Sequence, residues 1–152
     1  MIQHHAQALT MVDLTDNRPL DPQVQVLADD IRAAQGPEID TMTEWLQDWD
    51  EEVPDAMSDD SESDMGDHDM SDMDGEMPGM MSPADMQSLE DATDAEFQDR
   101  WLAMMAEHHE GAIEMAQDEV ENGQYEPAVE LAGLIEAAQT REVATMNELQ
   151  GQ

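Results

Sequence analysis

A pair of adjacent histidines occurs twice in this chain, and each pair is followed at the same distance by a methionine. The two copies lie 104 residues apart. They consist of His4, His5 and Met11 in the first copy, and of His108, His109 and Met115 in the second. Imidazole nitrogen and thioether sulfur both bind metal ions, and on a helix a residue and the seventh after it share one face. The duplication therefore predicts a metal site built from two equivalent halves.

Each histidine copy is followed by a second repeated stretch, in which polar residues occupy positions expected to face the core. The order and spacing are the same in both copies: Gln35, Glu38 and Met42 in the first, and Gln139, Glu142 and Met146 in the second. A buried carboxylate is costly unless it is paired or bound to a cation. We favour a role for the two glutamates, together with the two glutamines, as groups that orient the histidines by hydrogen bonds. Direct binding of a cation by the carboxylates is the alternative.

The helical positions of the histidines separate them into two classes. On a helical wheel six apolar residues lie within about 60° of His108, which places this histidine in the middle of an apolar stripe: Phe97, Trp101, Met104, Met105, Ala112 and Met115. His109 lies at the edge of the stripe. By the repeat, His4 is central and His5 lies at the edge. Further methionines near these stripes are candidate outer ligands: Met42, Met104, Met105 and Met146.

The residue types indicate which metal such a site would take. Imidazole and thioether form a soft donor set that favours Cu(I), with Ag(I) as its mimic. Di-iron bundles use a Glu-x-x-His motif, which neither copy contains. Zinc prefers more histidine or cysteine ligands than two central imidazoles supply. The ordinary alternative is that the histidines are hydrogen-bonded core residues and the methionines only fill space. We favour the metal site, because histidine, methionine and glutamate occur together on the inward stripes of both copies.

Four helical segments are expected, arranged as two hairpins of the same pattern. Asp21 followed by Pro22 is a helix start, Thr93 and Glu96 form a capping-box pattern, and Gly123 follows a helix end. The helices are expected at about residues 1–14, 22–49, 93–122 and 127–149. The fold class predicted from them is all-α, a ferritin-like four-helix bundle with approximate two-fold symmetry. Its expected parts are a shortened first hairpin (1–49), a linker (50–91) and a second hairpin (92–152).

The linker differs from both hairpins in composition. Residues 50–91 contain 16 acidic residues, no basic residue and 8 of the 15 methionines. This composition predicts that most of the segment is disordered, with a short helix from Pro83 to about Glu90. A flexible thioether-rich segment can also wrap a soft ion, and its candidate ligands are His68, Met70, Met73, Met77, Met80 and Met81. A merely solvated acidic linker is the alternative.

The overall composition excludes several classes of function. The 152 residues carry 39 acidic and only four basic side chains, all arginine, for a net charge of −35. Such a field repels nucleic acid and anionic membranes. No stretch is long and apolar enough to insert in a membrane, and the absence of cysteine excludes disulfides and thiol catalysis. Serine and threonine lie away from the histidine pairs, so we expect a binding protein and not an enzyme.

The residues Met104–Ala116 resemble the signature of the domain of unknown function 305 family, which is a ferritin-like helical family. The resemblance covers about residues 1–49 and 92–150. It implies a secreted, periplasmic or cell-surface protein, and some members of the family bind copper. Residues 1–15 show no signal peptide, and the first histidine pair begins abruptly, so the expectation of export rests on the resemblance. Carried over by position, the ligands it implies are His4, His5, Met11, His108, His109 and Met115.

From the residues and the resemblance together we expect an extracytoplasmic protein that binds copper, most readily Cu(I), or silver, for sequestration, transport or tolerance. Its partners are then metal ions, with a copper-delivery protein and a homo-oligomer left open by the sequence. The alternative is a metal-free acidic helical bundle that acts as an interaction or stress module.

Overall fold

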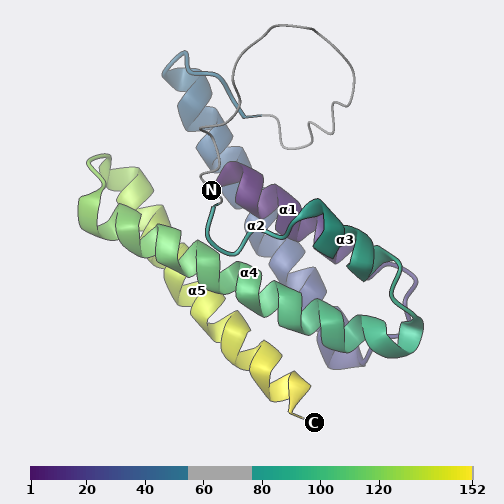
Figure 1. Ribbon diagram of the computed structural model, residues 1–152. Coiled ribbons are helices and arrows are strands. Elements are labelled where there is room, and N and C mark those ends of the chain that lie inside the picture. The colour runs from purple at the N-terminus through teal and green to yellow at the C-terminus, as the bar shows by residue number, and fades with distance from the viewer. Residues whose placement is uncertain (55–76, 152) are drawn as a thin grey trace, which may run out of the picture.

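The computed structural model describes residues 1–54 and 77–151, which form five helices and, within these ranges, no strand. The helices are α1 (Ile2–Asp13), α2 (Pro22–Asp48), α3 (Pro83–Glu90), α4 (Asp94–Asn122) and α5 (Glu126–Gln150). Figure 1 shows α1 and α2 as one hairpin and α4 and α5 as another. The predicted all-α class is confirmed.

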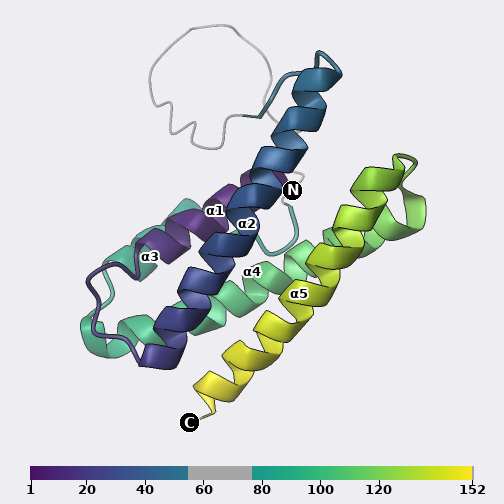
Figure 2. The same cartoon turned by 180° about the vertical axis from the view of Figure 1, so that it is seen from behind.

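The four long helices form a closed ring of neighbours. Helix α1 contacts α2, α2 contacts α5, α5 contacts α4 and α4 contacts α1. Figure 2 shows the same arrangement from behind, with α4 crossing behind α2. The bundle therefore brings together the two helices that carry the histidine pairs. No helix of the described chain is long and apolar enough to cross a membrane.

The helix starts follow from the capping residues, with one difference from expectation. The Asp21 carboxylate accepts a hydrogen bond of 2.8 Å from the Gln23 backbone N–H, ahead of Pro22 in the first turn. Thr93 is the N-cap of α4 as predicted, but its hydroxyl donates to the Glu96 carboxylate at 2.7 Å and caps no backbone N–H. A charged acceptor makes the stronger bond, so the reciprocal capping box does not form there.

The end of the predicted linker belongs to the folded core. Residues 77–82 lead into α3, and Met81 and Leu89 are buried together with residues of α1 and α4. Ser82 and Asp85 cap α3 reciprocally, so the predicted short helix is confirmed. Residues 55–76, with His68, Met70 and Met73, lie outside the described residues. Their metal-binding role and the predicted disorder stay predictions.

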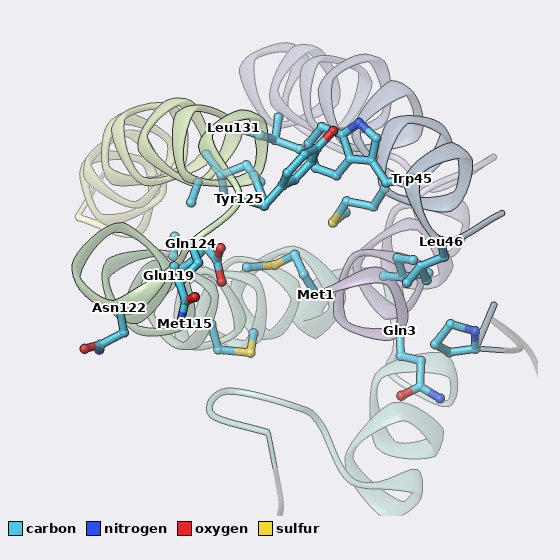
Figure 3. A pocket seen from close by; sticks show the side chains of 18 of the residues that line it. Met1, Gln3, Trp45, Leu46, Met115, Glu119, Asn122, Gln124, Tyr125 and Leu131 are labelled. Carbon is cyan, nitrogen blue, oxygen red and sulfur yellow. The ribbon is translucent and has the colours of Figure 1, made fainter. Parts of the chain in front are cut away.

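The two ends of the bundle are filled differently. At one end Phe97 and Trp101 of α4 are fully buried, and the Trp101 indole N–H donates to the Met11 backbone carbonyl at 2.8 Å. The residues packed there include Met11, Val24 and Leu27. The repeat-equivalent residues at the other end, Met115, Ala128 and Leu131, instead line an open cavity of about 690 Å³. Figure 3 shows this cavity, with Met1, Trp45 and Tyr125 also around it.

Candidate metal centre

The two central histidines meet where α1 crosses α4. His4 and His108 are 0% and 1% exposed, so the inward orientation predicted for both is confirmed. Their ring centroids are 3.8 Å apart and the planes are inclined by 38°. Two imidazoles from equivalent helices are thus brought into direct contact in the interior.

The two edge histidines each bind the glutamate of their own hairpin. The Nε2 atom of His5 lies 2.7 Å from Oε2 of Glu38, and that of His109 lies 2.9 Å from Oε2 of Glu142. Both histidine side chains are fully buried, and both glutamate side chains are 17% exposed. The predicted hydrogen bonds between these glutamates and histidines are therefore confirmed. They tie α1 to α2 and α4 to α5 in the same way.

The hydrogen bonds determine which ring nitrogen of each histidine is left for a ligand. Nε2 of His4 donates to the backbone carbonyl of Pro78 at 2.9 Å. Because carbonyl and carboxylate oxygens only accept, Nε2 carries the hydrogen in His4, His5 and His109, and the neutral ring has its lone pair on Nδ1. The Nδ1 atoms of all four histidines, and Nε2 of His108, are buried with no hydrogen-bond partner in the described chain.

Two buried glutamines repeat this lack of partners. Gln35 and Gln139 are 2% and 3% exposed, and neither amide end of either side chain has a partner in the described parts of the chain. The hydrogen bonds predicted from these glutamines to the histidines are therefore not formed, and the glutamates alone orient the edge histidines. An unpaired buried polar group costs about 1–3 kcal/mol, so such groups are rare without a ligand, ion or water. Their occurrence at equivalent positions of the repeat gives both hairpins the same buried amide group.

Burial also sets the protonation of the central histidines. It lowers the pKa of His4 from 6.5 to about 4, against the Pro78 hydrogen bond, which raises it. The pKa of His108 is lowered to about 2, by burial first and by the neighbouring His4 second. Both rings are therefore neutral at pH 7 and can bind a metal ion without first losing a proton.

We expect the two central histidines to make the metal-free protein progressively less stable as the pH falls below about 6.5. The pKa of each central histidine is lower in the folded than in the unfolded chain, so unfolding takes up protons in this range and is favoured by acid. At about pH 5, His4 alone should contribute about 2 kcal/mol less than at neutral pH. Urea unfolding of the parent and of a His4→Leu/His108→Leu variant isolates this effect, since leucine does not titrate. If the difference in unfolding free energy between the parent and the variant stays constant from pH 7 to pH 5, the expectation is wrong.

The candidate methionines fall into two sets on opposite sides of the histidines. Met11, Met105 and Met146 are fully buried in the main core. Their repeat equivalents Met115, Met1 and Met42 line the cavity. Met104 is partly buried and packs against the main core, as its place on the stripe suggested. Met1 was not among the candidates from the sequence, although its equivalence to Met105 was the signal that could have found it.

The donor set limits which ions the site fits. Among the described residues no group of three or more His, Asp or Glu side chains is arranged to hold a metal ion. A hard ion or zinc, which needs such a group, has no match there. Paired neutral imidazoles with thioethers nearby fit a soft ion of low coordination number. These residues thus suit Cu(I) or Ag(I) by their chemistry.

Comparison with known proteins agrees with this fold. The family described as Domain of unknown function (DUF305) matches residues 1–150. A solved DUF305 structure from Streptomyces coelicolor, described as a candidate secreted protein, is 30% identical with a TM-score of 0.79, over 98% of this chain and 86% of that chain. A DUF305 fragment from Deinococcus radiodurans is 27% identical with a TM-score of 0.79, over 99% and 90% of the two chains.

A third similar structure was solved with a metal. CopM in its Cu(II)-bound form is 25% identical with a TM-score of 0.76, over 99% of this chain and 90% of that chain. CopM in its Cu(I)-bound form is 23% identical with a TM-score of 0.73 and shows the shared fold. No curated protein sequence matches the chain.

Proposed function

The chain belongs to the DUF305 family, and on that premise we propose that it is an extracytoplasmic copper-binding protein for sequestration, transport or tolerance. The observation that carries the proposal is the buried contact between His4 and His108, whose Nδ1 atoms have no partner in the described chain. Similarity to the Cu(II)-bound form of CopM supports the choice of metal.

The histidine set is prepared for a metal ion in three respects. The central rings are neutral at pH 7, because burial lowers the pKa of each. The outer rings are fixed by Glu38 and Glu142, in the way that carboxylates commonly orient metal-binding histidines. Copper binding would supply the partners that the buried Nδ1 atoms lack, and so would offset the cost of burying them.

Thioethers complete the soft donor set. Met1, Met42 and Met115 border the open cavity, and are therefore the core methionines that an incoming ion can reach first. Met11, Met105 and Met146 are buried on the other side of the histidines. We propose that Cu(I) is bound by imidazole with thioether, and that Ag(I) occupies the same site.

A binding role explains the site better than catalysis. The histidine hydrogen bonds among the described residues go to two carboxylates and one backbone carbonyl, and not to a hydroxyl nucleophile. The lack of cysteine fits an oxidising compartment, because thioethers form no disulfides. The similar Streptomyces coelicolor structure, a candidate secreted protein, supports an extracytoplasmic location.

Competition titrations of the purified chain test the proposal. We expect Ag(I) and Cu(I), each measured against a chromophoric chelator, to bind at least about a hundredfold more tightly than Zn(II), because no group of three hard or imidazole ligands is present in the described chain. Equal affinity for Zn(II) would contradict the donor set. Absence of binding by all three ions would favour the metal-free interaction module.

A further inference from the structure

The short segment from Pro78 to Met81, here called the strap, touches both histidine helices at the central pair. Pro78 accepts the hydrogen bond from His4. The backbone of Met81 makes two bonds to the Gln7 side chain: its N–H donates to Oε1 at 2.7 Å, and its carbonyl accepts from Nε2 at 2.9 Å. The strap therefore makes three hydrogen bonds to α1, and the two residues involved, His4 and Gln7, lie within one turn of that helix.

On its other side the strap packs against the backbone of α4. A Cβ added to Gly111 would lie 1.9 Å from the Pro78 carbonyl oxygen and 2.6 Å from the Gly79 nitrogen. Gly79 itself has φ of +74°, and a Cβ there would lie 2.6 Å from the Glu107 carbonyl oxygen and 3.0 Å from that of His108. Both positions therefore require glycine.

The repeat departs from symmetry where the strap passes. Gln7 and Gly111 occupy equivalent positions, three residues after His4 and His108. One supplies an amide that matches the strap backbone, and the other removes a side chain that would collide with it. The difference between the two copies at this position is explained by a single segment lying between the two helices.

We propose that the strap is a positioning element of the metal site, with Gln7 and Gly111 as its anchors. This inference rests on the proposed copper binding. The Pro78 carbonyl holds His4 as the tautomer with hydrogen on Nε2, and so leaves Nδ1 as the nitrogen that would bind a metal ion. The side chain of His108 makes no hydrogen bond to the strap, so the strap does not fix which of its nitrogens is available. The strap thus makes the two central histidines chemically unequal ligands.

The tests are Gly111→Ala, which displaces the strap, and Gln7→Ala, which releases it from α1 without steric pressure. Gly133→Ala is the matched control, because Gly133 is also helical and a Cβ there meets nothing within 4 Å. The first readout needs no metal: ¹⁵N NMR of the His4 side chain reports its tautomer. We expect hydrogen on Nε2 in the parent and control, and a mixture of tautomers in both strap variants.

The second readout is Ag(I) affinity by competition, together with the His4 ¹⁵N shifts of the Ag(I)-bound chain. We expect Ag(I) to move the Nδ1 resonance of His4, and its affinity to fall about tenfold or more in both strap variants but not in the control. If both strap variants keep the tautomer and the affinity of the parent, the proposed positioning role of the strap is wrong. Ag(I) bound at Nε2 of His4 in the parent would have the same meaning. Neither result would contradict the proposed copper binding. A parent chain that binds no Ag(I) would overturn the proposed function, and with it the role of the strap towards metal.

Discussion

Replacing His4 and His108 together with leucine is expected to remove the tightest Ag(I) or Cu(I) site while leaving the chain folded. The two rings are in contact and buried, and they carry three ring nitrogens without a partner in the described chain. Loss of groups that merely orient metal ligands already costs ten- to a hundredfold in affinity, so loss of both central ligands should cost more than about a hundredfold. Competition titration with a chromophoric chelator measures the change.

The fold should survive because the exchange places apolar side chains in an apolar core. Leucine removes buried nitrogens that lack partners, which offsets the loss of the His4 bond to Pro78. Circular dichroism and urea unfolding check this. His68→Ala is the matched control, because it removes the one histidine that belongs to neither pair. Parent-like affinity for the first equivalent of metal in the double variant would assign copper binding to the methionine-rich linker instead.

The sequence was sufficient to predict the parts of the site that depend on side-chain pattern. A glutamate recurs in both copies among residues that are expected to face the core, which predicted that its carboxylate has a hydrogen-bond partner. The structure pairs Glu38 with His5 and Glu142 with His109. The inward orientation of His4 and His108 followed from helical periodicity in the same way. Both features repeat every turn or two, so they are visible in one sequence. The assignment of these residues to copper stays a prediction.

The strap could not be predicted, for an equally physical reason. Pro78 is 74 positions from His4, and it contributes a backbone carbonyl, which every residue type possesses. Its surroundings are acidic and rich in glycine and proline, a composition that predicted disorder. The sequence did contain one signal of the strap: Gln7 in the first copy of the repeat aligns with Gly111 in the second. A break in symmetry beside the histidines marks the place where an unrelated segment enters.

The second large effect is expected from Trp101→Ala, which should destabilise the whole bundle. Trp101 is fully buried among the residues of the main core, and its indole N–H is bonded to the Met11 carbonyl inside α1. Truncating a buried tryptophan costs about 3–5 kcal/mol. A domain of this kind has a total stability of only about 5–15 kcal/mol, so a large fraction would be lost. Urea unfolding followed by circular dichroism measures it.

The matched control is Trp49→Ala, because Trp49 is 48% exposed and lies beside the open cavity, in edge contact with Tyr125. It should cost about 1 kcal/mol or less, since little area leaves the core. Comparing the unfolding free energies of the two variants tests which end of the bundle contributes more to its stability. Equivalent positions of the repeat enclose the buried Trp101 core at one end and an open cavity at the other, so the Trp101 end is expected to contribute more to stability. Equal losses in the two variants would mean that the cavity end contributes as much to stability as the Trp101 end.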